Sequence, residues 1–470
     1  MTFSKYPEYK DSGVEWLGEV PMHWTLKDLK YCCDVIPSNV DKKSHPDERP
    51  VRLCNYTDVY YNNRITSDLE FMKATARKEE VEKFQLEIND VAITKDSESA
   101  DDIAVPAIVS ETVPGVLCGY HLAIIRAKKD AIGVFLNYLF QSDFLRYYFE
   151  ITARGLTRVG LSESAIGNSE IAWPSVSEQE RIAAFLDHET ARIDALIEEQ
   201  KRLIELLKEK RQAVISHAVT KGLDPDMPMK DSGVEWLGEV PAHWIVGKIK
   251  WYISTASGGT PSSSRSEDYY GGEIPWLRSL DLSDGVVTGF KVSVTAKALK
   301  ETSCRMVPAG SVLIAMYGGD GTIGKNGLLK FDSAINQALC AFIPTEFLMP
   351  EYLHKYFQFY RPYWMIGAES SRKDPNIGQD RIGDNYCLIP PRHEQATIVA
   401  RLDQDLNAMG DLQTEAAKLV ANLQERRSAL ISAAVTGKID VRNWRAFAES
   451  EAESYAMAAE PKAAYESKSS

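Results

Sequence analysis

The sequence of 470 residues lacks the features that mark an exported or membrane-spanning protein. It has no run of about eighteen apolar residues, the length that predicts a membrane-spanning helix. Its start, MTFSKYPEYKDSG, has no apolar segment of the kind found in secretory signal peptides. The seven cysteines are scattered and form no C-x-x-C pair. These absences predict a reduced, cytoplasmic protein with no membrane partner.

Catalytic and metal-binding motifs are also absent. No G-x-S-x-G occurs, no Cys/His array has zinc-ligand spacing, and no methyl-donor loop or (D/N)-P-P-(Y/F/W) motif is present. The nearest match is the P-loop-like GGDGTIGKN at 318–326, which has Asn326 where Ser or Thr would hold Mg²⁺. The following GLLKFD predicts a strand where a P-loop requires a helix, so we interpret this segment as a Gly-rich hairpin loop. The pattern predicts a recognition protein with no catalytic residues, no metal site and no bound cofactor.

The sequence has no excess of positive charge: 54 Lys and Arg stand against 67 Asp and Glu, and the formal net charge is −13. Of the two large blocks described below, 25–176 carries −5 and 245–392 carries +2. A protein that holds DNA alone usually presents a basic face to the phosphates. If this chain binds DNA, either its basic side chains cluster in space or a partner supplies much of the phosphate contact.

The most informative feature present is a long internal repeat. Residues 10–24 read KDSGVEWLGEVPMHW and residues 230–244 read KDSGVEWLGEVPAHW. A second motif is AWPSVSEQERIAAFLD in the first copy and LIPPRHEQATIVARLD in the second. Two copies of one unit therefore make up the chain, and such a repeat determines the architecture. The blocks 25–176 and 245–392 have diverged between near-identical frames, which suggests one scaffold that presents two different recognition surfaces.

A long helix is predicted in each copy, over 177–220 and 393–436. Ser177 with Glu180 forms a predicted capping box at the first start. Apolar residues recur along the first helix, including Leu196 and Leu203. In the second helix they step by threes and fours in a heptad seam, formed by Leu402, Met409, Leu412, Ala416, Leu419, Leu423 and Leu430. Helices of about 40 residues are roughly 60 Å long, and such a seam needs a partner. We expect the two helices to pair antiparallel; the alternative is that each packs on its own block.

The blocks between the repeated frames are predicted to be mixed α/β. Short β-like runs include Val91–Lys95, Val116–Arg126, Ser311–Tyr317 and Ala338–Ile343. Each block also has an aromatic-rich segment at helical spacing, 135–149 and 352–365, which we interpret as core rather than as a base-stacking surface.

The predicted fold is α+β. Two globular mixed α/β domains are separated by two long helices in an antiparallel coiled coil, with an internal pseudo-twofold repeat. The predicted segments are the signature 1–24, recognition block 25–176, helix 177–220, repeated signature 221–244, recognition block 245–392, helix 393–436 and a mobile tail 437–470.

The ordered motifs resemble a known family. The signature KDSGVEWLGEVPxHW, the motifs PSVSEQERIAAFLD and PPRHEQATIVARLD, and the loop GGTPSSS…YYGGEIPWLRSLDL at 258–282 are similar to those of the specificity subunit of Type I restriction–modification enzymes. The resemblance covers residues 6 to about 445. The parts fall in the family's order: target recognition domain, central helical region, second target recognition domain and C-terminal helical region.

The resemblance implies a DNA-recognition subunit without its own active site. Each recognition domain would read one half of a bipartite asymmetric DNA target, and the helices would set the spacer. The helical regions would bind two methyltransferase subunits, which use S-adenosylmethionine to methylate adenine. Two restriction subunits that use ATP and Mg²⁺ would complete the complex. The negative net charge is compatible with this assembly, because the methyltransferase subunits would share the phosphate contacts.

Candidate DNA-binding residues are the hydrogen-bonding side chains of predicted loops, since donors and acceptors must reach the groove edges. In the first block they are Asn55, Tyr56, Thr57, Lys95, Asp96, Ser97, Thr157 and Arg158. In the second block they are Thr260, Arg278, Ser279, Tyr317, Lys325, Ser371, Arg372 and Lys373. The alternative for each one is a solvated loop residue. Thr260, Arg278 and Lys325 lie in family-like motifs shared across specificities, so they would hold the fold or contact phosphates rather than choose bases.

Two other functions fit the sequence. A coiled-coil adaptor would use the blocks to bind proteins, and a gel shift with the methyltransferase subunit on random duplexes would distinguish it. A nucleotide-dependent enzyme would use the loop at 319–325, and a bound-nucleotide assay would test that.

Overall fold

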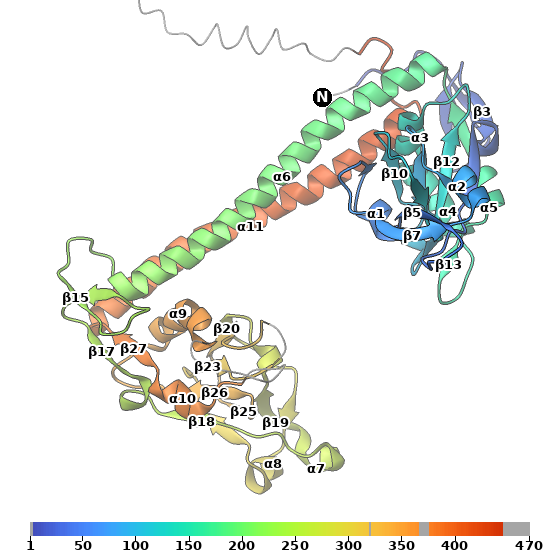
Figure 1. The fold of residues 1–470 in the computed structure, drawn as a ribbon. Helices are drawn as coiled ribbons and strands as arrows, with labels where there is room; N and C mark the ends of the chain where they lie inside the picture. The colour runs from blue at the N-terminus through green and yellow to red at the C-terminus, as the bar shows by residue number, and fades with distance from the viewer. Residues whose placement is uncertain (1–2, 319–320, 366–375, 445–470) are drawn as a thin grey trace, which may run out of the picture. The chain divides into compact units, whose positions relative to one another are not determined.

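Two compact units make up the protein (Figure 1). Unit 1 comprises residues 1–200 and 418–470, and unit 2 comprises residues 201–417. Each unit holds one globular α/β domain and part of each long helix, so the predicted fold class is confirmed. Among the described residues, no helix is both long and apolar enough to span a membrane. The structure, a computed structural model, describes residues 3–318, 321–365 and 376–444.

The domain of unit 1 contains a five-stranded sheet in the order β4-β12-β8-β10-β6. All its pairs are antiparallel except β10 with β6, which is parallel. A second sheet has the order β11-β5-β7, in which β5 and β11 are parallel. These strands are β4 (Cys33–Pro37), β5 (Arg49–Cys54), β6 (Arg64–Ile65), β7 (Met72–Ala76), β8 (Val91–Thr94), β10 (Pro106–Val109), β11 (Val116–Cys118) and β12 (Leu122–Ala127).

The domain of unit 2 has the same topology despite its diverged sequence. Its five-stranded sheet has the order β18-β26-β23-β24-β20, and again only the last pair is parallel. The second sheet, β21-β19-β25-β22, pairs β19 and β25 in parallel and adds one strand. These strands are β18 (Thr255–Ser257), β19 (Tyr270–Leu277), β20 (Gly285–Val287), β21 (Ser293–Val294), β22 (Arg305–Val307), β23 (Val312–Ala315), β24 (Asn326–Leu329), β25 (Ser333–Ile335) and β26 (Leu339–Phe342).

One predicted strand was wrong in its extent. The run predicted over Val116–Arg126 is two strands, β11 and β12, which lie in different sheets. The chain turns at Gly119, where a Cβ atom would lie 2.6 Å from the carbonyl oxygen of Cys54. A side chain at this position would collide with the neighbouring strand end, so the turn requires glycine.

The aromatic-rich segments form core helices. In α3 (Gly133–Phe140), Phe135, Leu136, Leu139 and Phe140 are fully buried, and in α9 (Pro350–Tyr360) Tyr352, Tyr356 and Phe357 are fully buried. The prediction of a core role is confirmed. The shorter helices are α1 (Tyr56–Tyr60), α2 (Lys78–Phe84), α4 (Asp143–Thr152), α5 (Glu163–Gly167), α7 (Ser266–Tyr269), α8 (Ala296–Glu301) and α10 (Gln379–Asp384).

The repeated signature and the repeated EQ motif contact each other in both units. Trp24 and Trp244 are buried, and their indole N–H groups donate to Glu178 (3.3 Å) and Glu394 (2.8 Å). The residue after each glutamate is a glutamine. Gln179 in unit 1 and Gln395 in unit 2 bond backbone groups just before α3 and α9, and each also bonds the carbonyl of the proline that follows the last strand before its long helix. The two motifs therefore form one clamp, which fixes each domain to the start of its long helix.

Around each clamp lie short pairs of antiparallel strands. They are the hairpins β1 (Tyr9–Asp11) with β2 (Glu19–Pro21) and β15 (Met229–Asp231) with β16 (Glu239–Pro241), and the pairs β3 (Thr25–Asp28) with β14 (Glu170–Trp173) and β17 (Ile245–Lys248) with β27 (Tyr386–Ile389).

The long helices are α6 (Val176–Lys221) and α11 (Arg392–Val435), and in each unit their segments pack antiparallel (Figure 1). In unit 1 Arg427 donates to Asp194 at 2.9 Å. In unit 2 Gln413 donates to the carbonyl of Ile204 at 3.4 Å. The predicted capping box at Ser177 was wrong: α6 begins at Val176, and the Ser175 hydroxyl accepts from the N–H of Glu178.

The helix seam also differs in part from the prediction. Leu402, Ala416, Leu423 and Leu430 are buried as expected, but Leu412 is 56% exposed and Leu419 is 42% exposed. The buried and half-buried series in α11 is Leu402, Leu406, Met409, Gln413, Ala416, Val420, Leu423, Arg427 and Leu430. This series keeps the 3–4 spacing of a heptad, and Leu412 and Leu419 each precede a seam residue by one position. Leu196 and Leu203 are likewise exposed in α6.

The signatures pack on helix ends in matching ways. A Cβ at Gly222, after α6, would contact Trp244 and Pro241, and a Cβ at Gly437, after α11, would contact Pro21 and Trp24. Both glycines have positive φ, 78° and 76°, so the backbone leaves each of the two helices through the left-handed region. In unit 1 this contact joins two distant parts of the sequence. Of the tail 437–470, predicted to be mobile, residues 437–444 are described and include the buried Ile439 and Val441. Residues 445–470 lie outside the described residues.

Candidate nucleic-acid interface

In unit 1 the candidate residues lie at one edge of the two sheets, where several strands end. Asn55, Tyr56 and Thr57 follow β5, whose last residue pairs with the last residue of β11. Lys95 follows β8, and its N–H donates to the carbonyl of His121 in the loop between β11 and β12. Because parallel β5 and β11 end together, these loops must lie side by side. We call the segments 55–57, 95–97, 119–121 and 154–158 the recognition edge of unit 1.

The fourth segment joins this edge through a short strand pair. Asp96 and Ser97 form β9 (Asp96–Ser97), which pairs with β13 (Val159–Gly160). The loop before β13 carries Thr157 and Arg158, both exposed, and its tip residue Leu156 is fully exposed. The structure therefore brings together segments that are about 60 residues apart in sequence.

A cavity of about 550 Å³ opens at this edge. Five predicted residues line it, namely Tyr56, Thr57, Asp96, Ser97 and Arg158. Seven further lining residues escaped the sequence reasoning: Lys42, Tyr60, Tyr61, Glu98, Ser99, Asp102 and His121. Asn55 caps α1 with its N–H on Asp58 at 2.7 Å, and Lys95 bonds Asp96 at 2.9 Å, so these two support the cavity rather than line it.

A chain of polar contacts holds one side of the cavity in place. Arg158 donates to His121 Nε2 at 3.2 Å, and His121 Nδ1 lies 3.0 Å from Asp96. On the other side the hydroxyl of Tyr60 donates to Asp102 at 2.6 Å. This hydrogen bond to a carboxylate raises the pKa of Tyr60 to about 12. The cavity thus presents fixed donors and acceptors to a ligand.

Aromatic rings complete the edge. Tyr56 and Tyr60 stack with ring centroids 5.4 Å apart, and Tyr61 is 76% exposed beside them. The Lys95 ammonium lies 5.0 Å from the ring of Tyr120, which is 50% exposed. Exposed tyrosines with nearby cations are a common arrangement in surfaces that contact nucleic acid.

The matching edge of unit 2 consists of different side chains. Arg278 and Ser279 follow β19, and the N–H of Arg278 bonds Asp281 at 2.9 Å, just as Asn55 bonds Asp58. Tyr317 follows β23 and forms a bridge with Asn376. Thr260 is exposed and donates to the side chain of Gln337, in the loop between β25 and β26. We call residues 278–279, 316–317 and 336–338 with Thr260 the recognition edge of unit 2.

Lys325 lies in the loop that resembles a P-loop. Gly324 before it has φ +73°, and its N–H bonds the carbonyl of Ala315, which returns the chain to the sheet. The next element is strand β24, as the sequence predicted, so no helix N-terminus follows Lys325 to face a phosphate. Residues 319–320 of this loop lie outside the described residues, as do Ser371, Arg372 and Lys373.

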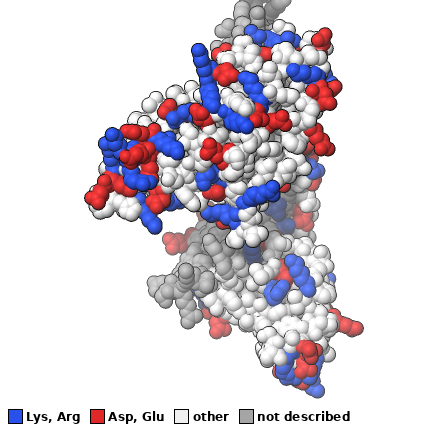
Figure 2. Space-filling model, turned by 90° about the vertical axis from the view of Figure 1, so that its right-hand side faces the viewer, with Lys and Arg blue, Asp and Glu red and all other residues white. Residues whose placement is uncertain are grey.

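Charge is mixed on the face drawn in Figure 2, where Lys and Arg lie among Asp and Glu with no broad patch of one sign. The cavity of unit 1 has the same character: Lys42 and Arg158 face Asp96, Glu98 and Asp102. Its carboxylates favour ligands with hydrogen-bond donors, and its cations favour phosphate.

Family and structure comparisons agree on one class of protein. Residues 243–417 match the family model described as "Type I restriction modification DNA specificity domain". A protein of Methanocaldococcus jannaschii, provisionally named the type I restriction enzyme MjaX specificity subunit, is 22% identical over 456 residues, which cover 94% of this chain and 99% of that protein. The type I restriction enzyme EcoKI specificity subunit of Escherichia coli (strain K12) is 23% identical over 449 residues, with coverage of 91% and 92%.

Solved structures share the fold. A chain from a structural study of complex assembly and conformational transition in the type I R-M system aligns with a TM-score of 0.71 at 19% identity, covering 89% of this chain and 99% of that chain. The HsdS subunit from Thermoanaerobacter tengcongensis aligns with a TM-score of 0.52 at 19% identity, covering 89% and 98%.

Proposed function

Because the chain belongs to the family of type I restriction–modification specificity subunits, the non-catalytic components that recognise DNA sequence, we propose that its two domains read the two halves of a bipartite, asymmetric DNA target. The observation that carries this proposal is the position of the candidate side chains. The two domains have diverged in sequence but share a topology. Candidate side chains lie at matching strand ends in both domains, and their chemical types differ from one domain to the other.

The side chains suit contacts with base edges and phosphates. In unit 1 Asp96 and Asp102 can accept from the amino groups of cytosine or adenine, while Arg158 can contact guanine or a phosphate. In unit 2 Gln337 is a residue type that pairs with adenine, and Arg278 is suited to contact with a phosphate. Arg372 and Lys373, beyond the described residues, remain candidates for phosphate contact. Because the net charge is −13, partner subunits would supply much of the remaining phosphate contact.

The helices provide a surface for those partners. Leu196 and Leu412 occupy equivalent positions in the two copies, as do Leu203 and Leu419, and all four are 39–56% exposed. Each precedes a seam residue by one position, so the apolar face of each helix is wider than its seam. We propose that two methyltransferase subunits dock on these leucines. S-adenosylmethionine would be bound by those subunits, and ATP and Mg²⁺ by two restriction subunits, with no cofactor on this chain.

The helices would also set the spacer between the half-sites. Both α6 and α11 contribute to both units, so a change in helix length alters the chain between the two recognition edges. Inserting four residues near Leu203 adds about 6 Å of helix, which corresponds to one or two base pairs at about 3.4 Å each. We expect the spacer to grow by that amount and the half-sites to stay unchanged. An unchanged spacer with full methylation would contradict this role.

The decisive experiment exchanges one recognition domain. Replacing residues 25–176 with the matching block of a relative should change one half of the methylated sequence and leave the other intact, as read by methylome sequencing of the host. Change in both halves would contradict independent reading. Absence of sequence-dependent DNA binding by the complex with methyltransferase would favour the protein-binding adaptor instead.

A further inference from the structure

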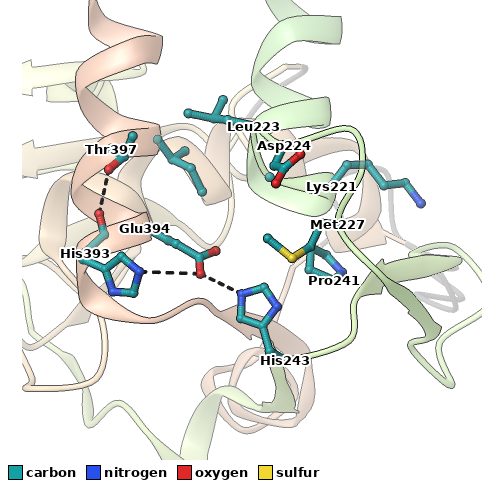
Figure 3. Close-up of a pocket in the computed structure, with 11 residues that line it drawn as sticks. Lys221, Leu223, Asp224, Met227, Pro241, His243, His393, Glu394 and Thr397 are labelled. Carbon is teal, nitrogen blue, oxygen red and sulfur yellow. Dashed lines mark hydrogen bonds and ion pairs between the residues drawn. The ribbon is translucent and has the colours of Figure 1, made fainter.

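Unit 2 has a cavity where unit 1 is filled. The cavity, of about 250 Å³, lies between the linker after α6 and the first turns of α11. Apolar parts of its wall come from Leu223, Met227, Pro241 and Ile398, and polar parts from His243 and Glu394. Figure 3 shows the Glu394 carboxylate between the two histidines of the cavity, facing Met227 and Pro241.

In unit 1 the same position relative to the clamp holds the ring of Tyr6. Its hydroxyl donates to Glu178 at 3.2 Å, and its ring lies 5.6 Å from His23 and 5.9 Å from Trp24, measured between centroids. Tyr6 is 3% exposed. Glu178, His23 and Trp24 are the repeat partners of Glu394, His243 and Trp244, so the first copy of the clamp has a tyrosine as a fourth member.

The second copy lacks that tyrosine. The repeat pairs Lys10 with Lys230, and the same offset pairs Tyr6 with Asp226, which is exposed. The register holds close to this point, because Met22 N–H donates to Glu8 and Ala242 N–H donates to Pro228 in the same way. The side chain that would fill the cavity in a faithful copy is therefore replaced by a carboxylate directed elsewhere.

The acceptor of the missing hydroxyl has remained. Glu394 accepts from His243 at 2.7 Å and from Trp244 at 2.8 Å, and its side chain is 26% exposed, against 7% for Glu178. A carboxylate has about four acceptor positions, so Glu394 can take a further donor. Among the described residues, no tyrosine hydroxyl donates to it.

We propose that the cavity beside Glu394 binds a phenol ring, and that its natural occupant is a tyrosine side chain of a protein partner. The ring would lie against Leu223, Met227 and Ile398 while its hydroxyl donates to Glu394, in the arrangement that Tyr6 shows in unit 1. An engineered cavity of about 150 Å³ is enough to hold benzene, so the volume here accommodates the ring. A protein occupant is favoured because the family works as one component of a multi-subunit enzyme.

The full chain can be titrated calorimetrically with 4-methylphenol, the side-chain analogue of tyrosine. We expect one site per chain, and binding of 4-methylanisole, which has the same shape but no donor, at least about tenfold weaker because the hydrogen bond to a carboxylate is lost. Crystals grown with 4-bromophenol should show one anomalous peak beside Glu394. Absence of binding at millimolar 4-methylphenol, or a peak elsewhere only, would overturn the proposal.

Two variants test the relation to unit 1. Tyr6→Ala should open a matching site beside Glu178, giving two equivalents of 4-methylphenol and a second bromine peak. Asp226→Tyr should supply the ring from the chain itself and remove the single site of the wild type. Unchanged binding in Asp226→Tyr would contradict the proposed position of the ring, and this variant stays informative if Tyr6→Ala proves unstable.

The identity of the occupant requires the assembled complex. A photo-crosslinking amino acid at Leu223, which is exposed, should join this chain to a tyrosine-containing segment of the methyltransferase subunit, identified by mass spectrometry. A crosslink only to segments without tyrosine, or none in a complex that methylates DNA, would refute the partner assignment. The phenol titration needs neither DNA nor partner, so its failure is distinguishable from failure of the proposed DNA function.

Discussion

Units 1 and 2 share a frame and a topology but not a recognition edge. The clamp of Trp, His, Glu and Gln recurs in both units, and the strand order and pair directions of the main sheet are equal. At the edge, however, a tyrosine-rich cavity with three carboxylates in unit 1 corresponds to Thr260, Arg278 and Gln337 in unit 2. This difference indicates that the repeated frame determines the fold, so the side chains of the recognition edge can differ without a change of fold.

The two cores also differ at one matched buried position. The helices α3 and α9 start at equivalent points, because Gln179 and Gln395 bond the residue just before each. Counting from there, Asn137 in unit 1 corresponds to His354 in unit 2, and both are buried. Of these two side chains only the histidine can take up a proton as the pH falls.

The largest expected effect compares the two clamps. Glu178→Ala should lower the free energy of unfolding of unit 1 by about 4 kcal/mol, because it leaves the buried hydroxyl of Tyr6 and the indole N–H of Trp24 without an acceptor. Glu394→Ala should lower the free energy of unfolding of unit 2 by only about 2 kcal/mol, since only one buried donor loses its acceptor there. Urea unfolding, followed by hydrogen exchange in each unit, measures the two losses in free energy of unfolding. Equal losses in the two units would show that Tyr6 does not stabilise the clamp.

Acid should weaken unit 2 more than unit 1. Burial, with a smaller effect of Lys355, lowers the pKa of His354 from 6.5 to about 4. The stability from its neutral form is complete above pH 6.5 and is lost as pH falls toward 4, by about 3 kcal/mol in all. His354→Asn, which copies unit 1, should flatten the acid side of the stability profile measured by urea unfolding. A profile that stays equally steep would assign acid sensitivity to other groups.

The recognition edges should act separately on DNA. Arg158→Ala should weaken binding of the complex to its target by about 2 kcal/mol through loss of one base or phosphate contact, and alter only one half-site. Gln337→Ala, in the recognition edge of unit 2, should alter only the other half. Competitive binding to duplexes randomised in each half measures this, with Arg64→Ala as a control because Arg64 is exposed and lies outside both edges. A change in both half-sites caused by one variant would show that the two recognition edges do not read DNA independently.

The smallest effect on folding is expected at the exposed leucines. Leu196→Glu and Leu412→Glu, at equivalent positions, should change stability by no more than about 0.5 kcal/mol because neither side chain is buried. Each should nevertheless reduce the amount of methyltransferase subunit that co-purifies with the chain. Leu402→Glu, a buried seam residue, is the contrasting variant and should unfold its unit. Full co-purification of both exposed variants would place the docking surface elsewhere.

The frame was predictable from sequence because its residues recur, as the two signatures and the EQ motifs show. The seam was only partly predictable. Leu412 and Leu419 satisfy a spacing of threes and fours as well as Gln413 and Val420 do, and only contact with the partner helix decides the phase. The capping residue was missed because Ser175 and Ser177 offer the same signal two residues apart.

The candidate site was predictable only in outline. Loop composition pointed to Tyr56, Asp96 and Arg158, which the fold does bring together. Asp102 was missed because it enters the cavity from a segment whose neighbours along the chain give no sign of it, and His121 was missed although its own tripeptide carried a signal. The internal repeat predicted that the two domains share a fold, but not which strand order they share, since strand order depends on pairing between distant segments. One available signal was the tripeptide GYH before β12, which places a histidine at a strand end.

The contacts at the two ends of the described chain have a topological consequence. The hydroxyl of Tyr9 donates to the carbonyl of Gly437 at 3.1 Å, and the N–H of Asp440 donates to the carbonyl of Ser4 at 2.8 Å. Hydrogen bonds thus close in unit 1 the junction that a peptide backbone makes in unit 2 after Gly222. Because only hydrogen bonds join these two segments in unit 1, a peptide link there combined with a break after Gly222 should leave the contacts within each unit unchanged.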